Sequence, residues 1–600
     1  MEITRIFDLL PYYKEKFQPK DDVLAVKING KWIKYDIDQF IDYVDTLSYA
    51  FIAKDLINQS KIGSISNNRP EWNFLDMACM QVGAVHVPIY PTISSEDYKY
   101  IFDDSDLEVL FISNLKLYNN IKSIIEDSPK IKEVYIFDEI EEEAITENNV
   151  KSWKELITLG KENVNREKLN EIKDNIKPYD FATLIYTSGT TGKPRGVMLS
   201  HIGFITNFKG VSPTPDFGDG SKALSFLPLC HVYERMLNYM YLYLGISIYY
   251  SENIAKFVDD CVEIQPQMMC CVPRVLEKIY YGILAKGRNL KGIKKYMFFR
   301  ALKIAEGYEL NNTNSKWYYF KWRIAYNLVL NKWNKALGGK FRIIVSGGSA
   351  LNPKICRIFH AALIPIYEGY GITEASPVIA VSSRPPKGLK IGTVGPPLPG
   401  TEVKISDDGE ILAKGPHIML GYYKNPELTK KVIDEDGWFH TGDFGRFDED
   451  GHLKIIGRKN ENFKTSGGKW IAPQPIENKL NASKFIDMSV VFGENRKLPG
   501  ALIVPDFLFL KNWCERNKIK FTTMDEILKN EAVRERYKKE INEVNKSLGK
   551  TEQIGNFILI PEEWSVKTGE LGATLKVKRN LVLTKYAEQI NAMYSKNDNS

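Results

Sequence analysis

The sequence predicts an α/β protein of more than one domain, and three observations lead to this prediction. The chain has 600 residues, more than the roughly 100–200 residues of a typical domain. Its first part alternates helical and strand patterns, which is typical of mostly parallel sheets, whereas short β segments separated by Asp-Gly turns begin near Thr401. After Arg458 the pattern becomes mixed again. We therefore expect a large N-terminal domain over 1–457 with mostly parallel sheets and a β-rich module at about 395–457, then a small α+β C-terminal domain over 458–600.

The spacing of apolar residues predicts the individual elements. Helical spacing over 40–57, and again before Gly83, predicts two helices that are each followed by a short apolar strand. The run 236–250 is shorter than the roughly 18 residues that a membrane span needs, so we expect a buried helix leading into a strand. The charge-rich stretch from Glu139 to Asn175 is expected to be an exposed connection with little pattern. Further strands are expected within 61–66, 85–90, 106–113, 131–138, 341–351 and 363–375.

Composition excludes several classes of protein. A net charge of +6 is small against 81 basic and 75 acidic residues and does not indicate nucleic-acid binding, although attraction to an anionic membrane surface stays open. The seven cysteines show no metal-ligand spacing, and the adjacent pair Cys270 and Cys271 suits a disulfide poorly. We therefore expect free thiols in a reducing compartment. Charged residues interrupt the N-terminal segment, which is not a signal peptide, so we expect a cytoplasmic protein, with peripheral membrane residence left open.

The stretch YTSGTTGKPRGVMLSH, residues 186–201, combines glycine, hydroxyl groups and cations. Backbone N–H groups approach a phosphate closely where no Cβ intervenes, and Lys193 adds charge. A Walker A loop requires a helix after its Lys, whereas Pro194 and a strand-like segment follow here. The loop therefore indicates phosphate binding of another kind, with a plain surface hairpin as the alternative if the loop stood alone.

Four further motifs follow this loop along the chain. They are YGITEASP (370–377), GWFHTGD (437–443), GRKNENFKTSGGKWIAPQPIE (457–477) and TGELGATLKVKR (568–579). Together with the loop they resemble, in order and over most of the chain, the adenylate-forming (AMP-binding) superfamily. The segments LPLCHVYERM (227–236), VPRVLEKIY (272–280) and NNRPEWNFLDMACMQVGAVHVPIYPT (67–92) resemble its long-chain fatty acyl-CoA synthetase branch.

This resemblance implies a reaction in two halves. A carboxylate attacks the α-phosphate of ATP to give acyl-adenylate and pyrophosphate, and the thiol of CoA then displaces AMP, with Mg²⁺ as cofactor. The small C-terminal domain would be mobile and would rotate between the halves about Asn460, where relatives commonly have Asp or Lys. Gly467 and Gly468 would then let the pantetheine arm of CoA pass.

The resemblance also assigns roles to residues. Glu374 would bind Mg²⁺, Thr373 would bind the α-phosphate and Tyr370 would stack on adenine. Asp443 would accept hydrogen bonds from the ribose, which Arg458 would approach from the other side. Arg195 stands where the family usually has Lys. The β- and γ-phosphates would lie against Thr187, Ser188, Gly189, Thr190, Thr191, Gly192 and Lys193, and the adenosine against Gly347, Gly348, Ser349, Glu368 and Gly369.

Lys576 is the residue expected to drive adenylation, because it would neutralise charge on the α-phosphate and the attacking carboxylate. Lys578 is the rival, since strand alternation would place both lysines on one face. His231 is expected at the mouth of an acyl tunnel, with a structural role left open. Aromatic and apolar residues near it suit a fatty chain, although periodicity alone would assign them to the core; they are Tyr233, Met236, Tyr239, Tyr241, Ile366, Ile372 and Val378.

The sequence is thus interpreted as an AMP-forming fatty acyl-CoA synthetase that uses a long-chain fatty acid, ATP and CoA. The alternatives are an adenylate-forming ligase for a shorter or aromatic acid, or one that loads a carrier protein. An inactive lipid- or nucleotide-binding relative is disfavoured because Lys193, Glu374, Asp443 and Lys576 are all present. An ADP-forming ATPase would lack its Walker loop. Acyl chain length and a homodimer are left open.

Overall fold

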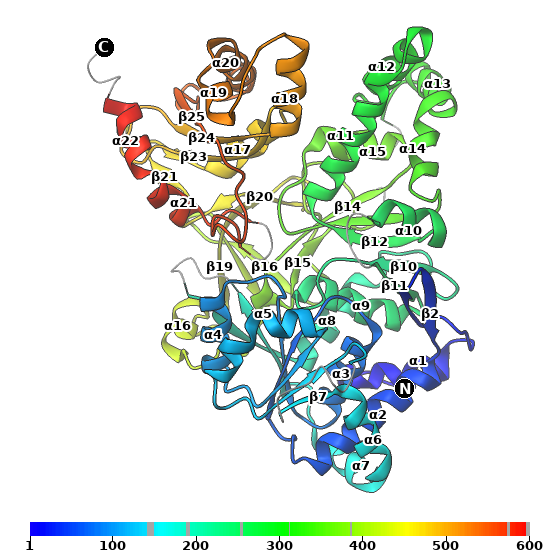
Figure 1. Cartoon of the computed structure of the whole chain (residues 1–600). Coiled ribbons are helices and arrows are strands. Elements are labelled where there is room, and N and C mark those ends of the chain that lie inside the picture. The colour runs from blue at the N-terminus through cyan, green and yellow to red at the C-terminus, as the bar shows by residue number, and fades with distance from the viewer. Residues whose placement is uncertain are drawn as a thin grey trace.

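The computed structural model describes residues 1–140, 149–187, 193–251, 256–310, 313–384, 387–572 and 576–595. Figure 1 shows the first two thirds of the chain as one body, with the C-terminal elements beside α11 (Pro273–Asn289) and α12 (Gly292–Ala305) at one end. Within the described residues the large domain holds two eight-stranded sheets, and the small domain is built on three strands. The α/β fold class is confirmed, including the mostly parallel sheets, the β-rich module and the separate C-terminal unit.

The first sheet has the order β15-β14-β13-β12-β10-β11-β1-β2, with antiparallel pairing only at its two edges. Its strands are short, and those between β10 and β13 are almost completely buried, as expected for a parallel sheet covered on both faces. They are β1 (Leu24–Ile28), β2 (Lys31–Tyr35), β10 (Lys222–Ser225), β11 (Ser247–Tyr250), β12 (Met268–Cys271), β13 (Ile343–Ser346), β14 (Ile366–Gly371) and β15 (Val378–Val381).

The second sheet has the order β18-β9-β8-β4-β3-β5-β6-β7, and its last five strands run parallel. The antiparallel pair β8–β9 carries the Gly-rich loop at its turn. The strands are β3 (Lys61–Ile65), β4 (Val85–Ile89), β5 (Val109–Ile112), β6 (Glu133–Ile136), β7 (Val150–Ser152), β8 (Phe181–Thr187), β9 (Arg195–Ser200) and β18 (Gly421–Tyr422).

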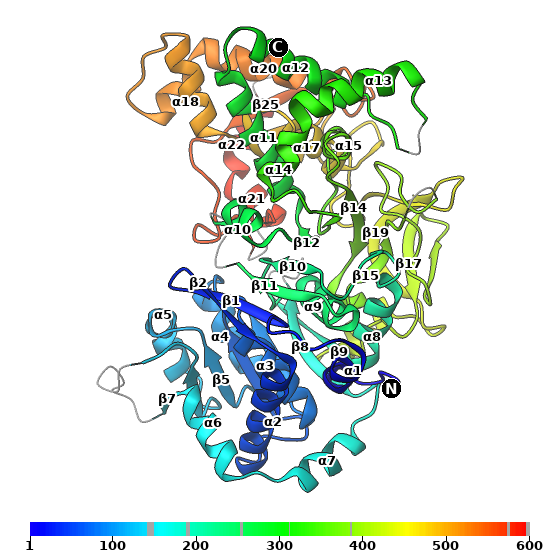
Figure 2. The same cartoon turned by 90° about the vertical axis from the view of Figure 1, so that its right-hand side faces the viewer.

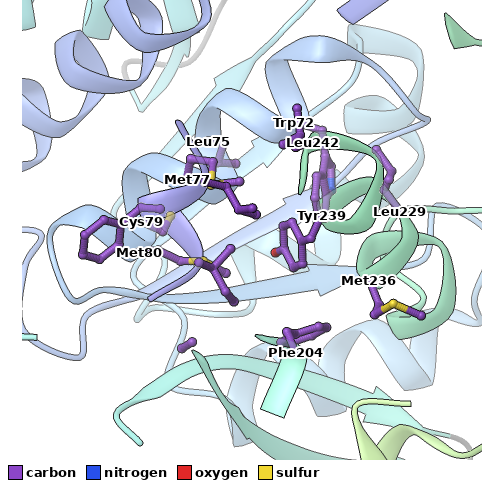
Figure 3. Close-up of a cluster of buried hydrophobic side chains, with 14 of the residues drawn as sticks. Trp72, Leu75, Met77, Cys79, Met80, Phe204, Leu229, Met236, Tyr239 and Leu242 are labelled. Carbon is purple, nitrogen blue, oxygen red and sulfur yellow. The ribbon is translucent and has the colours of Figure 1, made fainter. Parts of the chain in front are cut away.

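One hydrophobic core joins the helices that lie against both sheets. Every residue of α3 (Pro70–Gln81) is buried, so this helix has no solvent face. Figure 3 shows its side chains meeting those of α8 (His201–Val211) and α9 (Val232–Leu244). The same core includes η1 (Ile6–Asp8), α1 (Leu9–Lys16) and α2 (Ile37–Ala53).

Other helices cover the outer faces of the sheets. The second sheet packs on α4 (Ser95–Asp104) and α5 (Leu115–Glu126). The first sheet packs on a group that extends to one end of the molecule (Figure 2). That group comprises α10 (Phe257–Ile264), α11 (Pro273–Asn289), α12 (Gly292–Ala305), α13 (Lys316–Ala325), η3 (Tyr326–Leu330), α14 (Asn331–Ala336) and α15 (Pro353–Ala361).

The β-rich module is a four-stranded antiparallel sheet of β16 (Glu402–Ile405), β17 (Glu410–Lys414), β19 (Phe439–Phe447) and β20 (Leu453–Arg458), and α16 (Pro426–Val432) lies next to it. The last strand of this sheet ends at Arg458, where the sequence pattern changes. The boundaries 1–457 and 458–600 remain a prediction.

After Arg458 come the hairpin β21 (Phe463–Lys464) and β22 (Trp470–Ile471), and the sheet β23 (Ile486–Phe492), β24 (Gly500–Pro505) and β25 (Asn556–Leu559). The helices of this part are α17 (Pro473–Asn481), α18 (Phe507–Arg516), α19 (Met524–Lys529), α20 (Glu531–Asn545), α21 (Arg579–Lys585) and α22 (Ala587–Ser595).

Two expectations about local structure are wrong. The stretch Glu139–Asn175 contains β7 and two helices, α6 (Trp153–Glu162) and α7 (Arg166–Asn175). Gly160 lets α6 approach α2, because a Cβ there would lie 2.0 Å from the carbonyl oxygen of Thr46. The segment holding Lys576 and Lys578 is not a strand; apart from one isolated bridge it is irregular as far as it is described. Among the described residues no helix is long and apolar enough to cross a bilayer.

Candidate active site

The Gly-rich loop connects the antiparallel strands β8 and β9. Thr187 pairs with Arg195 at the last rung before the turn. A strand follows Pro194, so the prediction that this is not a Walker loop is confirmed. Lys193 is exposed, with its Nζ 5.6 Å from the ring centre of Tyr100. Ser188, Gly189, Thr190, Thr191 and Gly192 lie outside the described residues.

Tyr370, Asp443 and Arg458 come from three strands and meet in one cluster. The Tyr370 hydroxyl donates to Oδ2 of Asp443 at 2.7 Å, and the Arg458 Nε lies 3.2 Å from Oδ1. The antiparallel register of β19 and β20 places the acid opposite the arginine. Burial raises the pKa of Asp443, and Arg458 opposes that rise. The carboxylate is therefore fixed by a phenol on one oxygen and a guanidinium on the other.

Thr373 and Glu374 lie in the 3₁₀ turn η4 (Thr373–Ala375), directly after β14. The hydroxyl of Tyr422 on β18 donates to Oε1 of Glu374 at 2.8 Å. The guanidinium of Arg195 lies 5.9 Å from the ring centre of Tyr422. Glu374 is half-buried. The turn thus holds a carboxylate and a hydroxyl beside the strand that follows the Gly-rich loop.

Lys576 brings a cation from the small domain to this cluster. The pKa of Lys576 responds to the charges of Arg458, Asp443 and Glu461. Solvent still reaches the residue, but desolvation by the surrounding protein and then repulsion from Arg458 lower the pKa of Lys576 to about 8. The charge of Lys576 also lowers the pKa of His231, so charges from both domains interact here.

Lys578 has a different partner from Lys576. Its Nζ lies 4.0 Å from Oδ2 of Asp97 on α4. The next residue, Arg579, forms a bidentate pair with Glu477 at 2.7 Å to each oxygen, inside the small domain. The two lysines therefore have different electrostatic partners, and Lys576 is the one whose charge interacts with that of Asp443.

The glycine turn after β13 lies against α9. A Cβ on Gly347 would come within 3.1 Å of the ring of Tyr233, and Gly348 has a φ of +84° that favours glycine. Ser349 is exposed. Glu368 is buried on β14 next to Gly369, accepts a bond from the backbone N–H of Leu351 at 3.4 Å, and has its pKa raised to about 7 by burial. Its carboxyl therefore supports the turn after β13.

His231 caps the N-terminus of α9, where its Nδ1 accepts from the Tyr233 N–H at 3.1 Å. Burial, and then the charge of Lys576, lower the pKa of His231 to about 4, so the ring is neutral at pH 7. Met236, Tyr239 and Tyr241 are at most 1% exposed and belong to the core, as Figure 3 shows for the first two. Of the residues expected along a fatty chain, Ile366 also belongs to a core cluster, while Tyr233, Ile372 and Val378 lie at or beside the core.

A buried polar network went unrecognised in the sequence. Asp76 on α3 forms an ion pair with Arg235 on α9, His86 Nδ1 lies 2.7 Å from Asp76 Oδ1, and Tyr239 donates to the same carboxylate. Arg235 also donates to Thr183 Oγ1 at 2.6 Å. Burial alone would raise the pKa of Asp76, but Arg235, His86 and Tyr239 lower it overall. An acid within the apolar helix α3 was the available signal.

Two protein-family models match most of the chain. The AMP-binding enzyme family matches residues 14–423, and the AMP-binding enzyme C-terminal domain matches residues 462–598. Long-chain-fatty-acid–CoA ligase FadD15 of Mycobacterium bovis is 32% identical over 588 residues, covering 97% of this chain and 96% of the relative. Long chain acyl-CoA synthetase 7, a peroxisomal protein of Arabidopsis thaliana, is 32% identical over 569 residues, covering 90% and 78%.

A solved structure shares the fold over nearly the whole chain. The adenylation domain of the carboxylate reductase from Mycobacterium chelonae superposes with a TM-score of 0.76 at 20% identity, covering 98% of this chain and 91% of that one. The two family models thus define an AMP-binding enzyme with its C-terminal domain. The chain belongs to the AMP-binding enzyme family.

Proposed function

We propose that this protein is an AMP-forming long-chain fatty acyl-CoA ligase. It activates a long-chain fatty acid with ATP to give acyl-adenylate and pyrophosphate, and then transfers the acyl group to CoA. The observation that carries the proposal is the cluster of Tyr370, Asp443 and Arg458. The charge of Lys576 interacts with the charges of Asp443 and Arg458, and the charge of Arg458 also interacts with that of Glu374. Near full-length similarity to long-chain-fatty-acid–CoA ligases supports the choice of acid and acceptor.

The residues of the site match the needs of the first half-reaction. Two anions, a carboxylate and a triphosphate, must come together, so fixed cations and donors lower the barrier. Lys576 faces the attacking carboxylate and the α-phosphate. Asp443, held by Tyr370 and Arg458, receives the ribose hydroxyl groups. The hairpin turn with Lys193, and Thr373 in η4, receive the phosphates.

Glu374 fits the role of a Mg²⁺ ligand. Mg²⁺ prefers hard oxygen donors and usually binds one or two carboxylates together with substrate phosphates and water. Among the described residues no cluster of three or more acidic, His or Cys side chains could hold a metal without such help. When bound, the ion would neutralise charge on the phosphate oxygens. Glu374 would position it, and Tyr422 would orient the carboxylate.

Pyrophosphate release with saturated acids of increasing chain length, with and without CoA, tests the proposal. We expect release to rise with chain length, and continuous turnover to require CoA. The fastest release with a short or aromatic acid would favour the alternative ligase. Turnover that depends on a carrier protein rather than on CoA would show that the carrier protein is the acyl acceptor.

A pH profile tests the charge on Lys576. The pKa of Lys576 is lowered to about 8, so the ammonium is present below that pH and is lost as the pH rises through it. We expect kcat/KM for pyrophosphate release to fall above about pH 8, because this ratio reports groups of the free enzyme. In Lys576→Arg the guanidinium stays charged, so the descending limb should disappear even if the rate is lower. A limb that persists in the arginine variant would assign the titration to another group.

Asn460 is the proposed pivot of the small domain. The Lys459 N–H donates to the Gly442 carbonyl at 2.8 Å, and the Lys459 Nζ pairs with Asp408 and Glu410, so this residue is fixed to the β-rich module. Glu461 closes a turn by donating to the Arg458 carbonyl at 3.1 Å, with Asn460 at the third position.

Asn460→Pro should impair adenylation while ATP binding is kept. Proline is disfavoured at the third position of such a turn, because it forces the preceding residue away from the helical conformation. The present orientation, which brings Lys576 to Asp443, would be the one lost. ATP affinity by calorimetry and the two half-reactions measured separately check this, with Asn460→Ala as the control that leaves the turn intact. Equal loss of both half-reactions in a folded variant would place the pivot elsewhere.

A further inference from the structure

The positive charge of the chain is concentrated in one segment. The 55 residues from 286 to 340 contain 13 Lys and Arg but only two acids, Glu306 and Glu309. This segment therefore carries +11, and the other 545 residues carry −5. It begins in the last turn of α11 and continues through α12, α13, η3 and α14. We call it the basic tip.

Neither acid of the basic tip neutralises its cations. Glu306 pairs with Lys354 at 2.9 Å and Glu309 pairs with Arg357 at 3.1 Å, and both partners lie on α15 outside the segment. In the described part of the chain none of the 13 cations of the tip forms an ion pair. Its excess charge is thus left for an external partner.

The same segment exposes large apolar side chains. Seven of the 21 exposed large hydrophobic residues of the described chain lie inside the segment, over the 36 positions from 293 to 328. On α13 and η3 they recur at i, i+3, i+7 and i+11, which is one face of a helix. Trp317 and Phe320 are 64% and 56% exposed and stack on each other with ring centres 5.4 Å apart. The full set is Ile293, Tyr296, Phe299, Trp317, Phe320, Ile324 and Leu328.

The basic tip stands at one end of the molecule. Figures 1 and 2 both show α12 and α13 there, with their outer sides away from the sheets. Helix α13 is fixed to α15 behind it, because Trp322 Nε1 donates to the Ala361 carbonyl at 2.9 Å. It is fixed to α12 within the tip, because the Tyr318 hydroxyl donates to the Ile304 carbonyl at 2.6 Å. Helices that are fixed in place and expose aromatic and cationic side chains are suited to docking on a surface.

We propose that the basic tip docks the protein on the surface of an anionic lipid bilayer. Aromatic and aliphatic side chains that alternate with Lys and Arg are the composition of helices that lie in the membrane interface, where the rings enter the headgroup layer and the cations meet anionic lipids. A protein partner or a second copy would have to supply about as many acids as the tip has cations. The rest of this chain has only a small negative excess, spread over 545 residues.

The tip is also connected to the candidate active site. Helix α11 starts at Pro273 and ends where the tip begins. The residue before it, Val272, lies 3.7 Å from the position that a Cβ on Gly348 would take. If the tip docks on a bilayer, the length of helix α11 would separate the candidate active site from the lipid surface. Binding of the protein to lipid vesicles can be measured without its catalytic activity.

Vesicle binding by the full-length protein tests the proposal. We expect sedimentation with mixed phosphatidylglycerol and phosphatidylcholine vesicles, weak binding to phosphatidylcholine alone, and release by salt. The pair Lys294→Glu and Lys295→Glu should weaken binding to the anionic vesicles at least about tenfold, since each basic residue near the surface contributes to attraction. The matched control is the exposed pair Lys430→Glu and Lys431→Glu on α16, which should bind as the parent does.

A second measurement locates the contact. All seven native cysteines are buried, so a polarity-sensitive dye can be attached to Phe320→Cys, with Leu508→Cys on α18, which is 74% exposed in the parent, as the control. We expect anionic vesicles to shift the emission of the first dye to the blue and to leave the second unchanged. Equal binding to neutral and anionic vesicles would overturn the proposal. So would an unshifted dye at position 320, or a tip that binds nucleic acid or a second copy but not vesicles.

Discussion

Replacement of Lys576 by alanine should slow adenylation by about 10²–10³-fold, the effect expected when one preorganised charge-stabilising donor is lost. The charge of Lys576 interacts with those of Asp443 and Arg458, where the α-phosphate of ATP is expected. The second half-reaction, in which CoA attacks a supplied acyl-adenylate, should be spared because the small domain would have turned away. Pyrophosphate release and thioester formation from synthetic acyl-adenylate measure the two halves separately.

Lys578→Ala is the matched control for this experiment. Lys578 lies two residues away and faces Asp97 at 4.0 Å, so its removal should leave the intrinsic adenylation step within a few fold of the parent. If Lys578→Ala lost adenylation and Lys576→Ala kept it, the assignment of the two lysines would be reversed.

Asp76→Ala should destabilise the large domain by about 3–5 kcal/mol, because it leaves the Arg235 guanidinium buried without its counter-charge. Asp76 and Arg235 are completely buried, and Tyr239, His86 and Thr183 contribute to the same network. Denaturant unfolding of the large domain measures the loss. Asp97→Ala, which removes an acid with a 4.0 Å surface partner, should cost under about 1 kcal/mol.

The double variant Asp76→Leu, Arg235→Met separates the charge effect from the packing effect. Replacing both members of a buried pair by apolar residues of similar volume is often nearly neutral. We expect the double variant to be more stable than Asp76→Ala. If it were equally unstable, the loss would come from the shape of the α3–α9 contact rather than from the unpaired guanidinium.

The parts of the fold that follow from local chemistry could be predicted from the sequence. Pro194 excludes a helix after the Gly-rich loop, and Gly245 ends α9 in the left-handed conformation before β11. The charge-rich stretch was misjudged because polar composition hid two capped helices. Ser152 and Glu155 form a capping box, a signal that the sequence contained.

Contacts between distant segments could not be predicted in the same way. Apolar periodicity places α3 and α9 in the core, but it does not say that Asp76 would meet Arg235 across 159 residues. Alternation would have put Lys576 and Lys578 on one face. The chain around them is irregular instead, and their different partners, Asp443 and Asp97, depend on how the small domain lies against the large one.

Transfer of an oxygen isotope from the fatty acid tests the central claim most directly. The acid is supplied with ¹⁸O in its carboxylate, together with ATP, Mg²⁺ and CoA, and the phosphorus products are examined by mass spectrometry. If the carboxylate attacks the α-phosphate, the bridging oxygen leaves with AMP when the thiol attacks the acyl carbon, so AMP should carry one ¹⁸O and pyrophosphate none. Label in inorganic phosphate, formed together with ADP, would show attack at the γ-phosphate and would contradict the adenylation chemistry.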